Sequence, residues 1–119
     1  MGTYVVLYCL ELKQWIEPGD INDGPMKHQD VAGASALGCL LVHLLNHGTG
    51  SEPWPSVRMA GDQWRPPPGL PSHEEITTNR WASKRHHNDW REVTREAIES
   101  YNRSFPAMPQ LRHTPHLER

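Results

Sequence analysis

The feature that most constrains this chain is a stretch between residues 48 and 72, which holds six prolines and four glycines. Proline has a fixed φ angle and no backbone N–H, so it interrupts helices and central strands. The three consecutive prolines in "RPPPGLP" favour an extended polyproline conformation. We therefore expect a long irregular segment here, with at most a short strand in "SVRM", and regular elements on either side.

The residues at the start of the chain predict a pair of strands. "TYVVLYCL" (Thr3–Leu10) is rich in β-branched, aromatic and aliphatic residues, which is typical of a buried strand. "ELKQWIE" follows at once and can return as a second strand through Trp15 and Ile16. The turn-forming cluster "PGDINDGP" then ends this strand.

The segment Met26–His47 has the periodicity of an amphipathic helix. Its apolar residues recur at steps of three and four, at Val31, Ala34, Leu37, Leu41 and Leu45. Gly48 follows, where a left-handed residue commonly ends a helix. The pattern predicts a core face centred on Leu37 and Leu41, with His43 on the opposite side.

A second helix is predicted over Asp89–Arg103. Its apolar stripe consists of Trp90, Val93, Ala97 and Tyr101. Asn88 or Asp89 is a suitable N-cap for this helix. "SHEE" (Ser72–Glu75) matches a capping box and predicts a further helix start.

These elements predict an α+β fold. With 119 residues, the chain is long enough for one domain with a core of its own. We expect residues 1–105 to form a single compact domain, in which an antiparallel sheet of two or three strands packs against two helices. Residues 106–119 contain three prolines and no periodic pattern, so we expect a loosely ordered tail.

Composition and charge argue against several classes of protein. The formal net charge of −2 gives no global attraction to nucleic acid or to an anionic membrane. No apolar run is long enough to cross a bilayer, and the first residues lack the features of a secretory signal. The two cysteines, Cys9 and Cys39, form no CxxC pair. We expect a cytoplasmic protein with reduced thiols and no membrane contact.

Cys39, His43 and His47 recur every fourth residue, so they share one face of the first predicted helix. Zinc is bound by thiolate, imidazole and carboxylate ligands. Ligands from another element would have to complete such a site, and the available donors are His73, His86, His87 and Asp89. The metalloprotease motif HExxH is absent, because Leu44 follows His43. The alternative is structural, since histidines in a last turn interact favourably with the helix dipole.

"NRWASKRHHNDWR" (Asn79–Arg91) concentrates positive charge next to aromatic rings. Its basic residues are Arg80, Lys84, Arg85 and Arg91, and Trp81 and Trp90 bracket them. Such a cluster can bind the phosphates and stacked bases of a nucleic acid, and it can bind an acidic protein surface equally well. Because the rest of the chain has no basic stripe, we favour a protein partner over nucleic acid.

Five tryptophans in one small chain also point to an interaction surface, because tryptophan is enriched at binding hot spots. Trp54 and Trp64 lie in the irregular segment. They either pin this segment to the sheet or project from it as a recognition surface, and we expect pinning for at least one of them.

We predict a non-enzymatic protein-interaction module, such as a regulator or inhibitor. Proteins that phages and mobile elements direct against host defence machinery are one such class. The predicted partner-binding residues are Trp54, Trp64, Arg80, Trp81, Lys84 and Arg85. Two alternatives are a nucleic-acid binder that uses Arg80–Arg91, and a zinc protein or hydrolase whose ligands come from His43, His47, His86 and His87. A homodimer paired through an exposed sheet edge is a further alternative.

Overall fold

The computed structural model describes residues 4–24, 35–50, 52–78 and 88–115. It contains a four-stranded sheet with the order β3-β1-β2-β4. β1 (Val5–Cys9) pairs antiparallel with β2 (Gln14–Ile16) and β3 (Arg58–Gly61), whereas β4 (Arg91–Glu92) pairs parallel with β2. The predicted α+β class is confirmed, but the sheet has four strands instead of two or three, and one pair is parallel.

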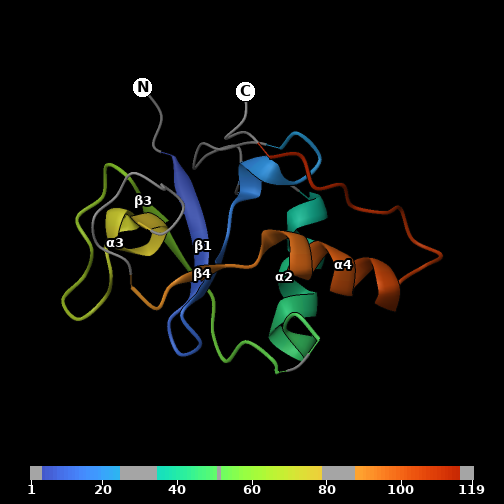
Figure 1. Cartoon of the computed structure of the whole chain (residues 1–119), viewed down its shortest axis with the longest axis horizontal. Coiled ribbons are helices and arrows are strands. Elements are labelled where there is room, and N and C mark those ends of the chain that lie inside the picture. Colours follow the sequence, from blue (N-terminus) through green and yellow to red (C-terminus); the bar gives the residue numbers. More distant parts are fainter. Residues whose placement is uncertain (1–3, 25–34, 51, 79–87, 116–119) are drawn as a thin grey trace.

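Both faces of β1 are buried, which explains why its sequence is apolar throughout instead of alternating. Successive side chains of a strand point to opposite faces of the sheet. Val5, Leu7 and Cys9 belong to the larger core, together with residues of α2 and α4. Val6 and Tyr8 belong to a smaller core, which also contains Trp15, Ala60, Ile76 and Trp90. In Figure 1, α2 and α4 lie on one side of β1 and α3 lies on the other.

α2 (Ser35–His47) ends where the sequence predicts, at Gly48, which has a φ of +63° and donates its N–H to the carbonyl oxygen of Leu44 at 2.8 Å. The predicted core face is correct only in part. Leu37 is buried and Leu41 packs against the core, as predicted. Leu40 and Leu44 are buried as well, whereas Leu45 is 40% exposed and His43 is only 2% exposed. The helix is therefore rotated so that His43 faces the core. Residues 26–34 of the predicted helix lie outside the described residues.

β4 takes the place of the predicted first turn of the second helix. The N–H of Arg91 donates to the carbonyl oxygen of Lys13 at 3.0 Å, and the N–H of Val93 donates to that of Trp15 at 2.8 Å. α4 (Thr94–Ser104) begins only after this pairing with β2, so the predicted start at Asp89 is wrong. In the described part of the chain, no helix is long and apolar enough to cross a membrane.

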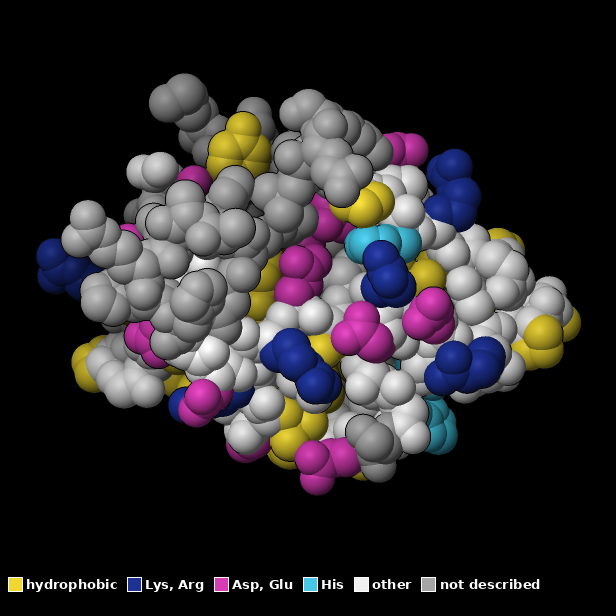
Figure 2. Space-filling view, in the orientation of Figure 1, with side chains coloured by type: hydrophobic (Ala, Val, Ile, Leu, Met, Phe, Trp, Pro, Cys, Tyr) yellow, Lys and Arg dark blue, Asp and Glu magenta, His cyan; other side chains and the backbone are white. Residues whose placement is uncertain are grey.

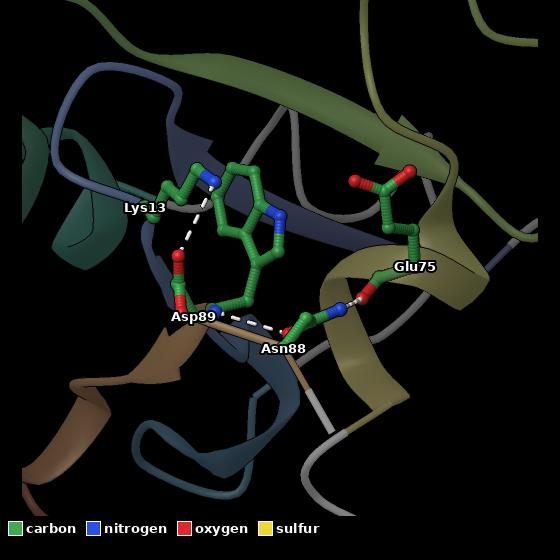
Figure 3. Close-up of polar contacts among 5 residues, drawn as sticks. Lys13, Glu75, Asn88 and Asp89 are labelled. Atoms are coloured by element: carbon green, nitrogen blue, oxygen red, sulfur yellow. Dashed lines mark hydrogen bonds and ion pairs between the residues drawn. The ribbon is translucent and has the colours of Figure 1, made fainter. Parts of the chain in front are cut away.

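Asn88 and Asp89 do not cap α4, as the sequence predicts, but connect other elements (Figure 3). The amide of Asn88 donates to the carbonyl oxygen of Glu75 at 2.8 Å, and its Oδ1 accepts from the N–H of Trp90 at 3.0 Å. Asp89 forms an ion pair with Lys13 at 3.6 Å, in which both side chains are at least half exposed. Such exposed pairs contribute little to stability. Asn88 thus links α3 to the residues that precede β4.

α3 (His73–Thr77) covers the smaller core with Ile76, which is fully buried. The Oγ of Ser72 accepts a hydrogen bond from the N–H of Glu75 at 3.1 Å, so the predicted N-cap is confirmed.

Trp54 fixes the irregular segment to the rest of the domain. Its side chain is 1% exposed, and its Nε1 donates to Oε1 of Gln14 at 2.8 Å. Its backbone N–H donates to the carbonyl oxygen of Leu44 at 2.9 Å. Pinning is therefore the role of Trp54, because its side chain joins this segment to β2 and its backbone N–H joins it to α2.

The packed part of the chain extends past residue 105, where the sequence predicts that the compact domain ends. Leu111 is 7% exposed and belongs to the larger core. The side-chain amide of Asn102 bonds to both the N–H and the carbonyl oxygen of Leu111, at 2.9 and 3.0 Å. The N–H of Thr114 donates to the carbonyl oxygen of Asp20 in the 3₁₀ helix η1 (Pro18–Asp20) at 2.7 Å. Residues 111–114 are thus attached to the turn that follows β2.

Candidate functional site

A buried polar pair joins α2 to α4. The Nε2 atom of His43 lies 2.8 Å from Oγ of Ser100, and these residues are 2% and 4% exposed. Three rings surround the imidazole, with centroid distances of 5.2 Å to His47 and 5.9 Å to both Tyr101 and Phe105. His43 is therefore a packing residue with one direct hydrogen bond across the helix interface.

Burial lowers the pKa of His43 from its ordinary value, and the neighbouring His47 lowers it further. Its Nδ1 atom is buried and has no hydrogen-bond partner among the residues that the structure describes. In the tautomer that carries the proton on Nε2, His43 donates to Ser100, and the Ser100 hydroxyl can then donate to another acceptor.

The predicted zinc site is not assembled by the part of the chain that the structure describes, which contains no group of three or more metal-ligating side chains. Nε2 of His43 already bonds to Ser100, and Cys39 is exposed. His86 and His87 lie outside the described residues. Zinc binding therefore stays a prediction.

An apolar groove lies between α2 and the end of α4, and we call it the α2/α4 groove. Its volume is about 640 Å³, and its lining consists of Gly38, Cys39, Val42, His43, Asn46, His47, Tyr101, Phe105 and Met108. Val42 is 60% exposed, Phe105 41% and Met108 50%. Because scattered single apolar residues are normal on a surface, the informative fact is that these three line the same groove.

A second hollow, which we call the polar pocket, lies next to the α2/α4 groove. Its volume is about 510 Å³, and it is lined by Asn46, His47, Gly50, Pro53, Ser100, Arg103 and Ser104. Asn46 and His47 line both hollows, so the two are neighbours. An apolar surface thus lies next to hydroxyl, imidazole and guanidinium groups.

The outer face of α4 has a different character. Figure 2 shows acidic and basic side chains over α4, and apolar side chains at the edge of the molecule where the chain leaves this helix. Arg95, Glu96, Glu99 and Arg103 are all exposed. The charged face of α4 is therefore distinct from the apolar surface at its end.

Trp64, one of the predicted partner-binding residues, lines a separate groove. The Trp64 groove has a volume of about 310 Å³, and its walls include Arg58, Arg65, Pro66, Pro67, Leu70 and His73. Trp64 is 39% exposed. Burial lowers the pKa of His73, and Asp62 opposes this effect.

Of the predicted partner-binding residues, the structure describes only Trp54 and Trp64, which have different environments. Trp54 is in the core and Trp64 is in its own groove, while Arg80, Trp81, Lys84 and Arg85 lie outside the described residues. Val42, Phe105 and Met108 are not among the binding residues predicted from the sequence. One signal was available, because Val42 is an apolar residue off the apolar stripe of its helix.

No protein-family model matches the sequence, and no curated protein or solved structure is significantly similar to it.

Proposed function

We propose that this chain is a non-enzymatic protein-interaction domain, and that the α2/α4 groove binds an apolar segment of its partner. The observation that carries the proposal is the exposure of Val42, Phe105 and Met108 around one groove. Well-packed apolar centres with polar rims are typical of protein interfaces. A regulator or inhibitor that acts by covering a surface of its partner needs such a binding surface and no catalytic group.

The His43–Ser100 pair does not argue for a hydrolase. A serine nucleophile needs a base that a third group orients. Within the described residues, Nδ1 of His43 has no hydrogen-bond partner, so no third group orients this imidazole. This pair therefore suits helix packing better than acyl transfer.

We also propose that the interaction takes place in the cytoplasm. Cys9 and Cys39 are both free thiols, one buried and one exposed. An exposed free thiol is common in a reducing compartment.

A peptide-display selection on the immobilised full-length protein tests the proposal. We expect it to enrich peptides with two or three apolar residues at helical spacing, since such segments commonly fill apolar grooves. Binding of a labelled selected peptide is then measured by fluorescence anisotropy. Val42→Arg places a charge in the α2/α4 groove, and Trp64→Arg is the matched control, because it places the same charge in the other groove.

The proposal predicts that Val42→Arg weakens peptide binding at least tenfold, while Trp64→Arg leaves it unchanged. Thermal unfolding of both variants checks that they remain folded. Selected peptides that respond only to Trp64→Arg would assign the interaction to the Trp64 groove and contradict the proposal. A selection without any peptide sensitive to Val42→Arg would contradict it as well.

A further inference from the structure

We infer that the partner segment bound in the α2/α4 groove carries a carboxylate, which Arg103 binds in the polar pocket. This inference rests on the proposed function and specifies the chemistry of the partner. It concerns a protein segment with an apolar face and an Asp or Glu side chain at one end.

The position of Arg103 is the first observation. A Cβ added at Gly50 would lie 3.7 Å from Nη2 of Arg103 and 4.0 Å from Oγ of Ser100. The guanidinium and the hydroxyl therefore face the same loop, on the wall of the polar pocket. A guanidinium presents several N–H donors in a plane, which matches the two oxygens of a carboxylate.

In the described part of the chain, Arg103 has no partner of opposite charge. Glu96 and Glu99 are exposed on the same helix, yet within residues 4–24, 35–50, 52–78 and 88–115 no carboxylate forms an ion pair with Arg103. No described basic side chain other than His47 lines the pocket with it. An acidic group is thus the complementary ligand, and charge complementarity between partners favours specific association.

Ser100 supplies a second donor. Its hydroxyl is held by the buried His43, at 2.8 Å from Nε2. When Nε2 carries the proton, the Ser100 O–H is available to the same carboxylate as Arg103. A buried histidine thereby positions the hydroxyl, and no proton needs to be transferred.

The proximity of the two hollows determines the kind of segment that can bind. Asn46 and His47, in the last turn of α2, line both of them. A single amphipathic segment can therefore place apolar side chains among Val42, Phe105 and Met108 and an acidic side chain beside Arg103.

The experiment uses the same full-length protein and the same peptide library, with Arg103→Glu as a second selection target. We expect the wild type to enrich Asp or Glu next to the apolar positions, and Arg103→Glu to enrich Lys or Arg there. For one acidic peptide, we expect Arg103→Gln to weaken binding about tenfold, as loss of a charge-assisted hydrogen bond does. Arg95→Gln is the matched control on the same helix and should leave binding unchanged.

The outcomes separate this inference from the proposed function. One outcome is that Val42→Arg weakens peptide binding, but the selected peptides have no preference for Asp or Glu and Arg103→Gln leaves binding unchanged. This outcome would overturn the inference and leave the proposed function in place. A dimer that Val42→Arg dissociates, seen by light scattering after size exclusion, would show that a second copy of this chain fills the groove and would overturn the inference too. A preference that reverses with Arg103→Glu supports it, since a merely structural role of Arg103 would not reverse the charge of the ligand.

Discussion

Trp54 and Trp64 belong to the same irregular segment but have opposite environments. Trp54 is enclosed by the larger core and bonded to Gln14, whereas Trp64 is 39% exposed in a groove. The sequence around them, "EPWP" and "QWRPPP", is similar in composition, so composition alone cannot tell them apart. The burial of Trp54 depends on contacts with Gln14 of β2 and Leu44 of α2, and Gln14 is distant in sequence.

Replacement of each tryptophan by alanine should therefore have unequal effects. We expect Trp54→Ala to lower the free energy of unfolding by about 3–5 kcal/mol, because it removes a large buried side chain and leaves a cavity. Trp64→Ala should cost about 1 kcal/mol or less, as partly exposed positions usually do. Urea denaturation followed by circular dichroism measures both, and equal losses would contradict the environments described here.

His43 makes stability depend on pH. Burial lowers its pKa in the folded state below about 6.5, the value for an exposed imidazole. Its surroundings are Ser100, Tyr101 and Phe105 from α4 and His47 from its own helix, none of which is a carboxylate. Between the two pKa values the unfolded chain binds more protons, so stability present above pH 6.5 is lost as the pH falls toward the folded pKa.

The free energy of unfolding should therefore fall on acidification from about pH 8 to pH 5. His43→Gln retains a hydrogen-bonding side chain beside Ser100 but does not titrate, so its stability should depend less on pH. His73, whose pKa is also lowered by burial, accounts for a remaining part of the dependence. Identical pH profiles for the wild type and His43→Gln would show that His43 is not desolvated.

At the scale of elements, the ends of some helices could be predicted from residues that are neighbours in the sequence. Gly48 ends α2 and Ser72 caps α3 because both effects depend on neighbouring residues. β4 was not predictable in this way. Its two residues are ordered by a parallel pairing with β2, and a helix-like pattern of apolar residues runs across its sequence.

The rotation of α2 was also not predictable from neighbouring residues. A histidine at position 43 is polar in the sequence, and its burial is stabilised by the Ser100 hydroxyl on α4, which is distant in sequence. The α2/α4 groove follows from this rotation, since Val42 then points away from the core. The candidate site was therefore the least predictable part of the molecule, because it depends on how two helices distant in sequence pack.

Gly48 and Gly69 provide a matched test of the end of α2. Both have positive φ values, +63° and +83°. A Cβ at Gly69 would meet no atom within 4 Å, whereas a Cβ at Gly48 would collide with the carbonyl oxygen of Glu52. We expect Gly69→Ala to cost about 1 kcal/mol from backbone strain alone, and Gly48→Ala to cost clearly more. Equal shifts in melting temperature would contradict this geometry.

At the scale of the whole molecule, the sheet separates two cores, and the exposed apolar side chains around the α2/α4 groove lie beside the larger one. The two cysteines lie in different places, one in the α2/α4 groove and one in the larger core, so their reactivities test the two places separately. Cys39 is exposed in the groove, while Cys9 is buried in the larger core. Burial also raises the pKa of the Cys9 thiol, which reduces the fraction of reactive thiolate.

The most direct test of the central claim is the rate at which N-ethylmaleimide modifies each cysteine in the native protein, measured by mass spectrometry of peptides. We predict rapid labelling of Cys39, labelling of Cys9 only through unfolding, and slower labelling of Cys39 when a selected groove-binding peptide is bound. Protection of Cys39 to the same degree as Cys9 in the free protein would show that the groove is closed. A Cys39 rate that the bound peptide leaves unchanged would show that the partner binds elsewhere.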